Sequence, residues 1–227
     1  MVYIVIVGLL LILIYGPQLW VQSVLNHYNR KPESNFPGTG GELARHILDR
    51  YELKEITVEI TDKGDHYDPL NLAVRLSRDK FEGKTLTAIT VAAHECGHAI
   101  QHAAAEPMFM WRTRLAKTAV WAQALGSLLL FGAPVLVLLF RIPSVALVNI
   151  AGAFLMIGFA VIIQLMTLPV EIDASFNKAL PILKSGYLSD AQVAPAHRIL
   201  RAAAWTYVAA SLAGLLNFWR CLAVLRR

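Results

Sequence analysis

Charged residues are scarce in this 227-residue chain: they make up only 16% of it, whereas hydrophobic residues make up 56%. A typical soluble domain carries about 25% charged residues, so the composition disfavours an ordinary water-soluble fold. Cysteine is also scarce, with two residues and no C-x-x-C pair, which excludes a disulfide framework. The net charge of +5 is modest and the basic residues are not interleaved with aromatic ones, so we expect no nucleic-acid partner.

The hydrophobic residues are concentrated in long runs, one near the N-terminus and three in the second half of the chain. Each run is long enough to cross a bilayer as a helix, which predicts a mainly α membrane protein with about four transmembrane helices. No basic segment precedes the first run, so we interpret it as a retained anchor and not as a cleaved signal peptide. The predicted division is an anchor at 1–25, a polar section at 26–117, a transmembrane hairpin at 118–170, a second polar section at 171–201, and a C-terminal helix with a basic tail at 202–227.

Lys and Arg residues are distributed unevenly around the predicted spans. A transmembrane hairpin returns the chain to the side that it left, so both polar sections are expected on one face of the membrane. Basic residues near the spans are more frequent on that face, and the positive-inside rule assigns such a face to the cytoplasm. We therefore expect a multi-pass protein of the cell membrane, in contact with lipid, whose polar sections face the cytoplasm.

The first polar section contains patterns of both helix and strand. Residues 41–53 show helical periodicity, whereas residues 54–62 and 70–77 alternate between apolar and polar side chains, which predicts two strands joined by a turn. The second strand either lies at an edge of a sheet, where it would pair with an extended peptide, or lies inside the sheet. A further helix is expected to begin at Thr85 or Thr87, either of which can cap it. The section thus predicts a small α+β domain.

This last helix carries the sequence TVAAHECGHAIQ at residues 90–101. His94 and His98 are four residues apart, so they share one face of a helix and two imidazoles can bind one metal ion. Glu95 lies about 100° further around the helix, from where its carboxylate can reach a water at the metal. This H-E-x-x-H pattern is typical of zinc peptidases in which the glutamate is the general base. The helix is apolar all round, which favours a buried metal site over two incidental histidines on a surface helix.

A catalytic zinc ion requires a third protein ligand besides the two histidines. His102 lies about 12 Å from His94 along a straight helix, which is too far for both to bind the same ion. Cys96 points away from the histidine face and is expected to pack as a small hydrophobe. Glu171 and Asp173 lie beside an apolar run, where a charge is costly unless it is paired. If this segment is helical only one of the two carboxylates can face the ion, and the residues alone leave open which one does.

Several short motifs occur together in the chain, namely HYDP, VRLS, AAHECGHAIQHA, LPVEIDAS and AAAWTYVAAS. With these motifs the chain resembles the neutral zinc metallopeptidases of the YugP type, from Gly41 to about Asn217. The resemblance implies a zincin-like catalytic domain of the gluzincin kind, with Zn²⁺ as cofactor and Glu171 as third ligand. CAAX prenyl proteases and heat-shock membrane proteases are similar around this glutamate, but they carry an aspartate at the position of Ser175. Asp173 is a candidate for the supporting role of that aspartate.

The predicted function is hydrolysis of peptide bonds in a protein or peptide substrate, in the turnover of membrane proteins or peptides. A water activated by zinc attacks the scissile carbonyl, and Glu95 transfers its proton to the leaving amine. The charge that develops on the carbonyl oxygen requires a further hydrogen-bond donor. Residues expected in supporting or donor roles are Asp173, His66, His102, His197, Arg201 and Tyr207.

Two other functions are compatible with the H-E-x-x-H pattern. An intramembrane protease of the site-2 type would carry an Asp-Gly pair, which this sequence lacks. A non-catalytic membrane scaffold stabilised by zinc would need the histidines but not Glu95. The oligomeric state is not indicated by any pattern in the sequence.

Overall fold

The computed structural model describes residues 2–30, 36–140 and 143–205, and divides the chain into two compact units. The first unit lies within Gln18–Met110 and Pro169–Thr206, and it contains all three described strands. The second unit lies within Met1–Pro17, Trp111–Leu168 and Tyr207–Arg227. The candidate site residues that the structure describes all belong to the first unit.

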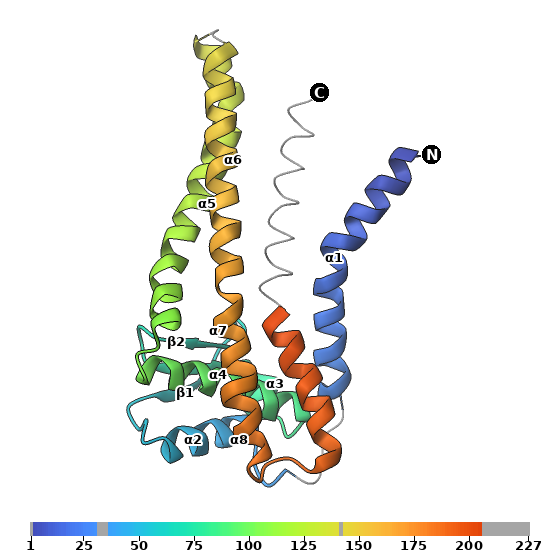
Figure 1. The fold of residues 1–227 in the computed structure, drawn as a ribbon, viewed down its shortest axis with the longest axis vertical. Helices are drawn as coiled ribbons and strands as arrows, with labels where there is room; N and C mark the ends of the chain where they lie inside the picture. The colour runs from blue at the N-terminus through green and yellow to red at the C-terminus, as the bar shows by residue number, and fades with distance from the viewer. Residues whose placement is uncertain (1, 31–35, 141–142, 206–227) are drawn as a thin grey trace. The chain divides into compact units, whose positions relative to one another are not determined.

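Long helices make up the described part of the second unit. It contains most of α5 (Pro107–Phe140), all of α6 (Pro143–Met166) and the first part of α1 (Val2–Asn29). Helices α5 and α6 run side by side (Figure 1). Ala119 of α5 and Ile163 of α6 form a small buried cluster, and Leu115 packs against it.

The prediction of about four transmembrane helices is wrong. In the part of the chain that the structure describes, no helix is both long enough and apolar enough to cross a membrane. The prediction rested on the length of the apolar runs in the sequence, and the described helices do not confirm it. Most of the fourth predicted span, at 202–219, lies outside the described residues.

A small sheet forms one part of the first unit. Its strands are β1 (Thr57–Ile60), β2 (His66–Asp68) and β3 (Ala73–Leu76), in the order β1-β3-β2. Strand β1 runs parallel to β3, and β2 runs antiparallel to it. The strands predicted at 54–62 and 70–77 are therefore present, but a third strand occupies part of the predicted turn. Strand β3 is paired on both sides, so it is the inner strand and not an edge.

Two helices pack beside this sheet in the first unit. Helix α2 (Gly40–Arg50) buries Leu43, Ile47 and Leu48, as its periodicity predicts, and Thr39 and Glu42 cap it reciprocally. Helix α4 (Leu86–Ala103) is buried along nearly its whole length, and its first turn is capped by the side chain of Thr85, which accepts from Ala88 N. A short helix, α3 (Arg78–Phe81), precedes α4.

The second chain segment of the first unit is almost entirely helical. It consists of α7 (Leu168–Ile172), the π-helix η1 (Asp173–Ala179), α8 (Leu180–Lys184) and a further helical stretch at 190–205. In η1 the backbone N–H of Leu180 donates to Ser175 O, five residues earlier, which is the bonding pattern of a π-helix.

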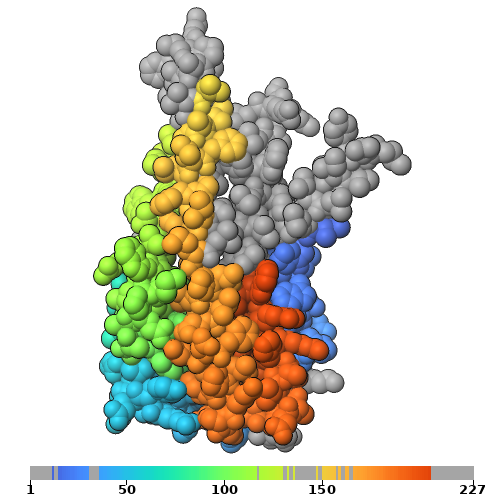
Figure 2. Space-filling model, viewed as in Figure 1, coloured from blue at the N-terminus to red at the C-terminus, as the bar shows by residue number. Residues whose placement is uncertain are grey.

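The two chain segments of the first unit share one hydrophobic core. Buried residues of α2, β3 and α4 lie in the same cluster as Leu183, Ile199 and Leu200. Figure 2 shows the cyan residues around α2 directly against orange residues from the second segment. The His46 and Tyr187 rings meet edge to face with centroids 5.8 Å apart, and Arg50 Nη1 donates to Ser185 Oγ at 3.2 Å. This packing places the segment after Leu168 against α4.

Candidate metal centre

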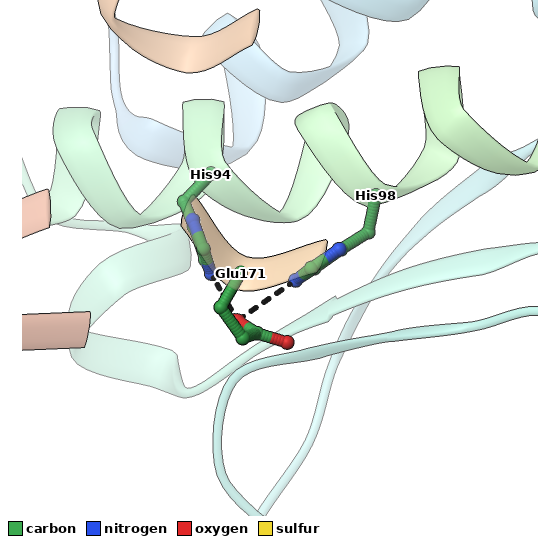
Figure 3. A group of neighbouring side chains, drawn as sticks. All are labelled: His94, His98 and Glu171. Carbon is green, nitrogen blue, oxygen red and sulfur yellow. Dashed lines mark hydrogen bonds and ion pairs between the residues drawn. The ribbon is translucent and has the colours of Figure 1, made fainter. Parts of the chain in front are cut away.

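Helix α4 presents His94 and His98 on one face, as their four-residue spacing predicts (Figure 3). Their ring centroids are 4.8 Å apart, and each residue is only 3% exposed. A long run of alanines and other small or apolar residues surrounds them on the helix, which allows neighbouring segments to approach α4 closely.

Glu171 reaches both histidines from α7. Its Oε2 atom lies 3.2 Å from His94 Nε2 and 3.3 Å from His98 Nε2, as the dashed lines in Figure 3 mark. One ligand-type atom from each of the three residues lies within 4.8 Å of the other two, and all three side chains are buried. The structure thus brings together three residues, of which the first, His94, and the last, Glu171, are 77 positions apart in the sequence.

The donor set fits a zinc ion. Zinc bonds to histidine nitrogen and carboxylate oxygen are about 2.0–2.2 Å long, and two ligands at tetrahedral angles are then separated by about 3.3–3.5 Å. The separations of 3.2 and 3.3 Å between Glu171 Oε2 and the two Nε2 atoms agree with this geometry. Two histidines and one glutamate are a ligand set of catalytic zinc sites, in which the fourth position holds water or substrate. His94, His98 and Glu171 would therefore hold the ion.

Both histidines have a partner on the ring nitrogen that faces away from Glu171. His94 Nδ1 is 3.1 Å from Ser175 Oγ, and His98 Nδ1 is 2.9 Å from Gln101 Oε1. Such contacts fix the orientation of a metal-binding imidazole and increase its basicity. Ser175 is thus the partner of His94, at the position where the sequence comparison with CAAX prenyl proteases and heat-shock membrane proteases led us to expect an aspartate. The sequence did not single out Gln101, although its spacing of three residues from His98 placed it on the same face.

Glu95 lies on α4 between the two histidines and is 7% exposed. It does not belong to the three-residue group, which agrees with a general base that acts on water and does not bind the metal. Cys96 is fully buried, and its Sγ faces Ala44 O at 3.6 Å, away from the histidine face. Burial raises the pKa of this thiol well above its ordinary value, so it stays protonated and unreactive.

Asp173, the other candidate ligand, is not part of this three-residue group. It accepts from Gln101 Nε2 at 2.8 Å and from Asn177 Nδ2 at 2.7 Å, and it lies 3.4 Å from Lys178 Nζ. Burial by itself would raise the pKa of Asp173, but these hydrogen bonds and the charge of Lys178 lower it below its ordinary value. Asp173 therefore contacts Gln101, the residue whose Oε1 lies against His98.

His102 is separated from the group, as its position along the helix predicts. Its Nδ1 is 2.9 Å from the hydroxyl of Tyr67 on β2. Burial is the main cause that raises the pKa of Tyr67 to about 12, so the hydroxyl that faces His102 keeps its proton. Phe109 packs between the two histidine-bearing turns, with ring centroids 6.1 Å from His98 and 5.5 Å from His102. No pattern in the sequence indicated this contact.

The remaining predicted donors are placed elsewhere or are not described. His66 Nδ1 bonds within its own turn to Gly64 O at 2.8 Å. The exposed His197 packs on Phe176, with ring centroids 4.9 Å apart. Arg201 lies over the ring of Trp20, at 5.9 Å from its centroid. Tyr207 lies outside the described residues.

The site consists of two buried histidines at helical spacing, a glutamate between them and a second glutamate from a later helix. This arrangement is typical of zinc metallopeptidases. Comparison with known proteins agrees with this class: the chain belongs to the family described as "Putative neutral zinc metallopeptidase", whose model matches residues 3–226. The chain is 34% identical over 210 residues to the "Putative membrane protease YugP" of Bacillus subtilis (strain 168), covering 91% of this chain and 88% of that protein. No solved structure matches the chain significantly.

Proposed function

We propose that this chain is a zinc metallopeptidase that hydrolyses peptide bonds in protein or peptide substrates. The observation that carries the proposal is the buried group of His94, His98 and Glu171, with Glu95 on the same helix. Membership of a zinc metallopeptidase family supports the same activity. The turnover of membrane proteins or peptides is the role that we propose for it.

The chemistry follows from the ligand set. Zinc, when bound, polarises a carbonyl group and lowers the pKa of a water to about 7. Two neutral imidazoles and one carboxylate offset only one of the two positive charges of the ion, so the site stays electrophilic. His94, His98 and Glu171 are almost fully buried, and electrostatic interactions are stronger in such a site than in water.

Glu95 is the residue that moves the proton in this proposal. Its carboxylate accepts a proton from the attacking water and then delivers it to the leaving amine. General acid–base catalysis of this kind contributes about 10²–10⁴-fold to a rate. We therefore expect the Glu95→Gln variant to bind zinc in the same 1:1 ratio as the unmodified chain and to cleave peptides about 10²–10⁴ times more slowly. Cleavage of a library of quenched fluorescent peptides and metal analysis of the same samples measure both quantities.

The matched control is Glu52→Gln, the same change at an exposed position. This control should retain both zinc and cleavage. If Glu95→Gln retained zinc and cleaved at the rate of the control, the peptidase mechanism would be wrong. A zinc-stabilised scaffold without catalysis would instead show no cleavage by the unmodified, zinc-loaded chain.

A location at a membrane is part of the proposal. It is supported by the name of the Bacillus subtilis relative, which describes that protein as a membrane protease. Fractionation of cells that express the tagged chain tests this location: the chain should sediment with the membranes and remain there after a high-salt wash. Recovery of the chain in the supernatant would contradict it. The cytoplasmic face predicted for the site is tested in the same cells by protease accessibility.

A further inference from the structure

Gln101 is a buried amide at the junction of the two chain segments that form the metal centre. It lies on α4, three residues after His98, and is 1% exposed. A buried amide without hydrogen-bond partners is destabilising, so the partners of each polar atom of Gln101 have to be identified. The amide has one carbonyl oxygen and two N–H donors, and the structure provides a partner for each.

The three partners lie on both segments. Gln101 Oε1 is 2.9 Å from His98 Nδ1, and Gln101 Nε2 donates to Val170 O at 3.0 Å and to Asp173 Oδ2 at 2.8 Å. Val170 immediately precedes Glu171 in the sequence. One side chain therefore contacts the ring of one ligand residue and the backbone next to another.

The chemistry of these partners allows only one orientation of the amide. A backbone carbonyl and a carboxylate can only accept hydrogen bonds, so the NH₂ group has to face Val170 and Asp173. A flipped amide would bring its oxygen against two other oxygens and leave both N–H donors facing the histidine side. Gln101 Oε1 consequently faces His98 Nδ1, which has to carry a hydrogen and donate it. The Nε2 lone pair of His98 is then directed at Glu171 Oε2 and is available to a metal.

Asp173 is itself held in place by a hydrogen bond and an ion pair. Asn177 Nδ2 donates to it at 2.7 Å, and Lys178 Nζ lies 3.4 Å from it. Lys178 also pairs with Glu106, which lies between α4 and α5, at 2.7 Å. These contacts fix the acceptor that orients Gln101. The partner of His94 Nδ1 is instead the hydroxyl of Ser175, which can rotate and also donates a long hydrogen bond to Leu200 O at 3.4 Å.

We propose that Gln101 is a positioning residue of the metal centre: it holds His98 with Nε2 free for the metal and clamps the Glu171 segment onto α4. The inference rests on the proposed function, since it concerns the same zinc site. It assigns to one side chain both the orientation of a ligand and the closure of the two halves of the site.

The Gln101→Met variant tests the proposal, because methionine has a similar length and shape but forms no comparable hydrogen bonds. Zinc affinity is measured by competition with a chromophoric chelator on the full chain. Partners of metal-binding histidines contribute about 10–100-fold to metal affinity, so we expect Gln101→Met to bind zinc about 10–100 times more weakly. The matched control, Gln123→Met at an exposed position of α5, should bind zinc as the unmodified chain does. Equal zinc affinity of Gln101→Met and the control would overturn the proposal.

A second measurement needs no substitution and covers the case in which Gln101→Met does not fold. In the zinc-loaded chain labelled with ¹⁵N-histidine, the His98 Nδ1–H proton should be protected from exchange with solvent by its buried bond to Gln101. Rapid exchange of that proton would overturn the proposal even if zinc is bound. An unmodified chain that binds no zinc would instead refute the proposed function itself, so the two failures are distinguishable.

Discussion

At the scale of single residues, two carboxylates two positions apart lie in different surroundings. The sequence placed Glu171 and Asp173 together beside an apolar run, and only a family resemblance favoured Glu171 as a ligand. The structure shows the physical difference, because Glu171 is fully buried against both histidines whereas Asp173 is partly exposed and bonds to Gln101 and Lys178. The ligand role of Glu171 stays a prediction that a substitution can test.

We expect Glu171→Gln to weaken zinc binding by more than about 100-fold, since it removes a charged ligand, which is a larger loss than that of a supporting residue. Asp173→Asn is the matched comparison: its amide oxygen can still accept from Gln101, so it should weaken zinc binding less than Glu171→Gln does. Chelator competition measures both values. A larger loss in Asp173→Asn than in Glu171→Gln would reverse the assignment of the two residues.

The sequence predicted the residues of α4 better than those of the second segment. His94, Glu95 and His98 follow from a local motif, and helix geometry alone excluded His102 as a ligand of the same ion. The contacts of Ser175 and Gln101 depend on how α7 and η1 pack against α4, which no local pattern encodes. The π-helical turns of η1 change which side chains face α4. The spacing of an α-helix therefore could not predict the contact between Ser175 and His94.

At the scale of elements, the close contact of α4 with η1 determines whether the site can form. Gly97 lies between the two histidines, and a Cβ atom at this position would be 2.8 Å from Ala174 O. The glycine therefore permits close packing of η1 against α4. Helices α2 and α4 were predictable from periodicity and caps, whereas β2 was not, because its three residues lie in a turn-rich stretch.

The variant Gly97→Ala gives a test in which local and tertiary effects have opposite signs. Helix propensity alone would make alanine stabilising by about 1 kcal/mol. Because the added methyl group would contact the Ala174 backbone, we expect a net destabilisation of about 1–3 kcal/mol and weaker zinc binding. Urea unfolding of the zinc-loaded chain measures this. The control is Gly132→Ala in α5, where a Cβ atom would meet nothing within 4 Å and no destabilisation is expected. A more stable Gly97→Ala would show that η1 does not pack on α4 in this way.

At the scale of the whole molecule, the metal centre joins two chain segments that are far apart in sequence. Gln18–Met110 contributes the histidines and Pro169–Thr206 contributes Glu171. The spans predicted between these segments rested on apolar runs in the sequence, and no described helix is long and apolar enough to confirm them. The division of the chain into five sections, with boundaries after residues 25, 117, 170 and 201, stays a prediction. The family match, in contrast, extends over residues 3–226 and includes both contributing segments.

Removal of zinc should destabilise the unit that contains the site. A ligand that binds only the folded state at 100 times its Kd stabilises that state by about 2.7 kcal/mol. We therefore expect a chelator to lower the Tm of the unmodified chain, and added zinc to restore it. The His94→Ala variant is the control, and its Tm should not respond to either addition. An unmodified chain with the same Tm in chelator and in zinc would show that the ion does not join the two segments.

The most direct test of the central claim is a crystal structure of the zinc-loaded chain with anomalous data collected at the zinc absorption edge. We predict one anomalous peak about 2.0–2.2 Å from the Nε2 atoms of His94 and His98 and from a carboxylate oxygen of Glu171. A peak that is coordinated instead by Asp173 or His102, or the absence of any peak between the two histidines, would contradict the account.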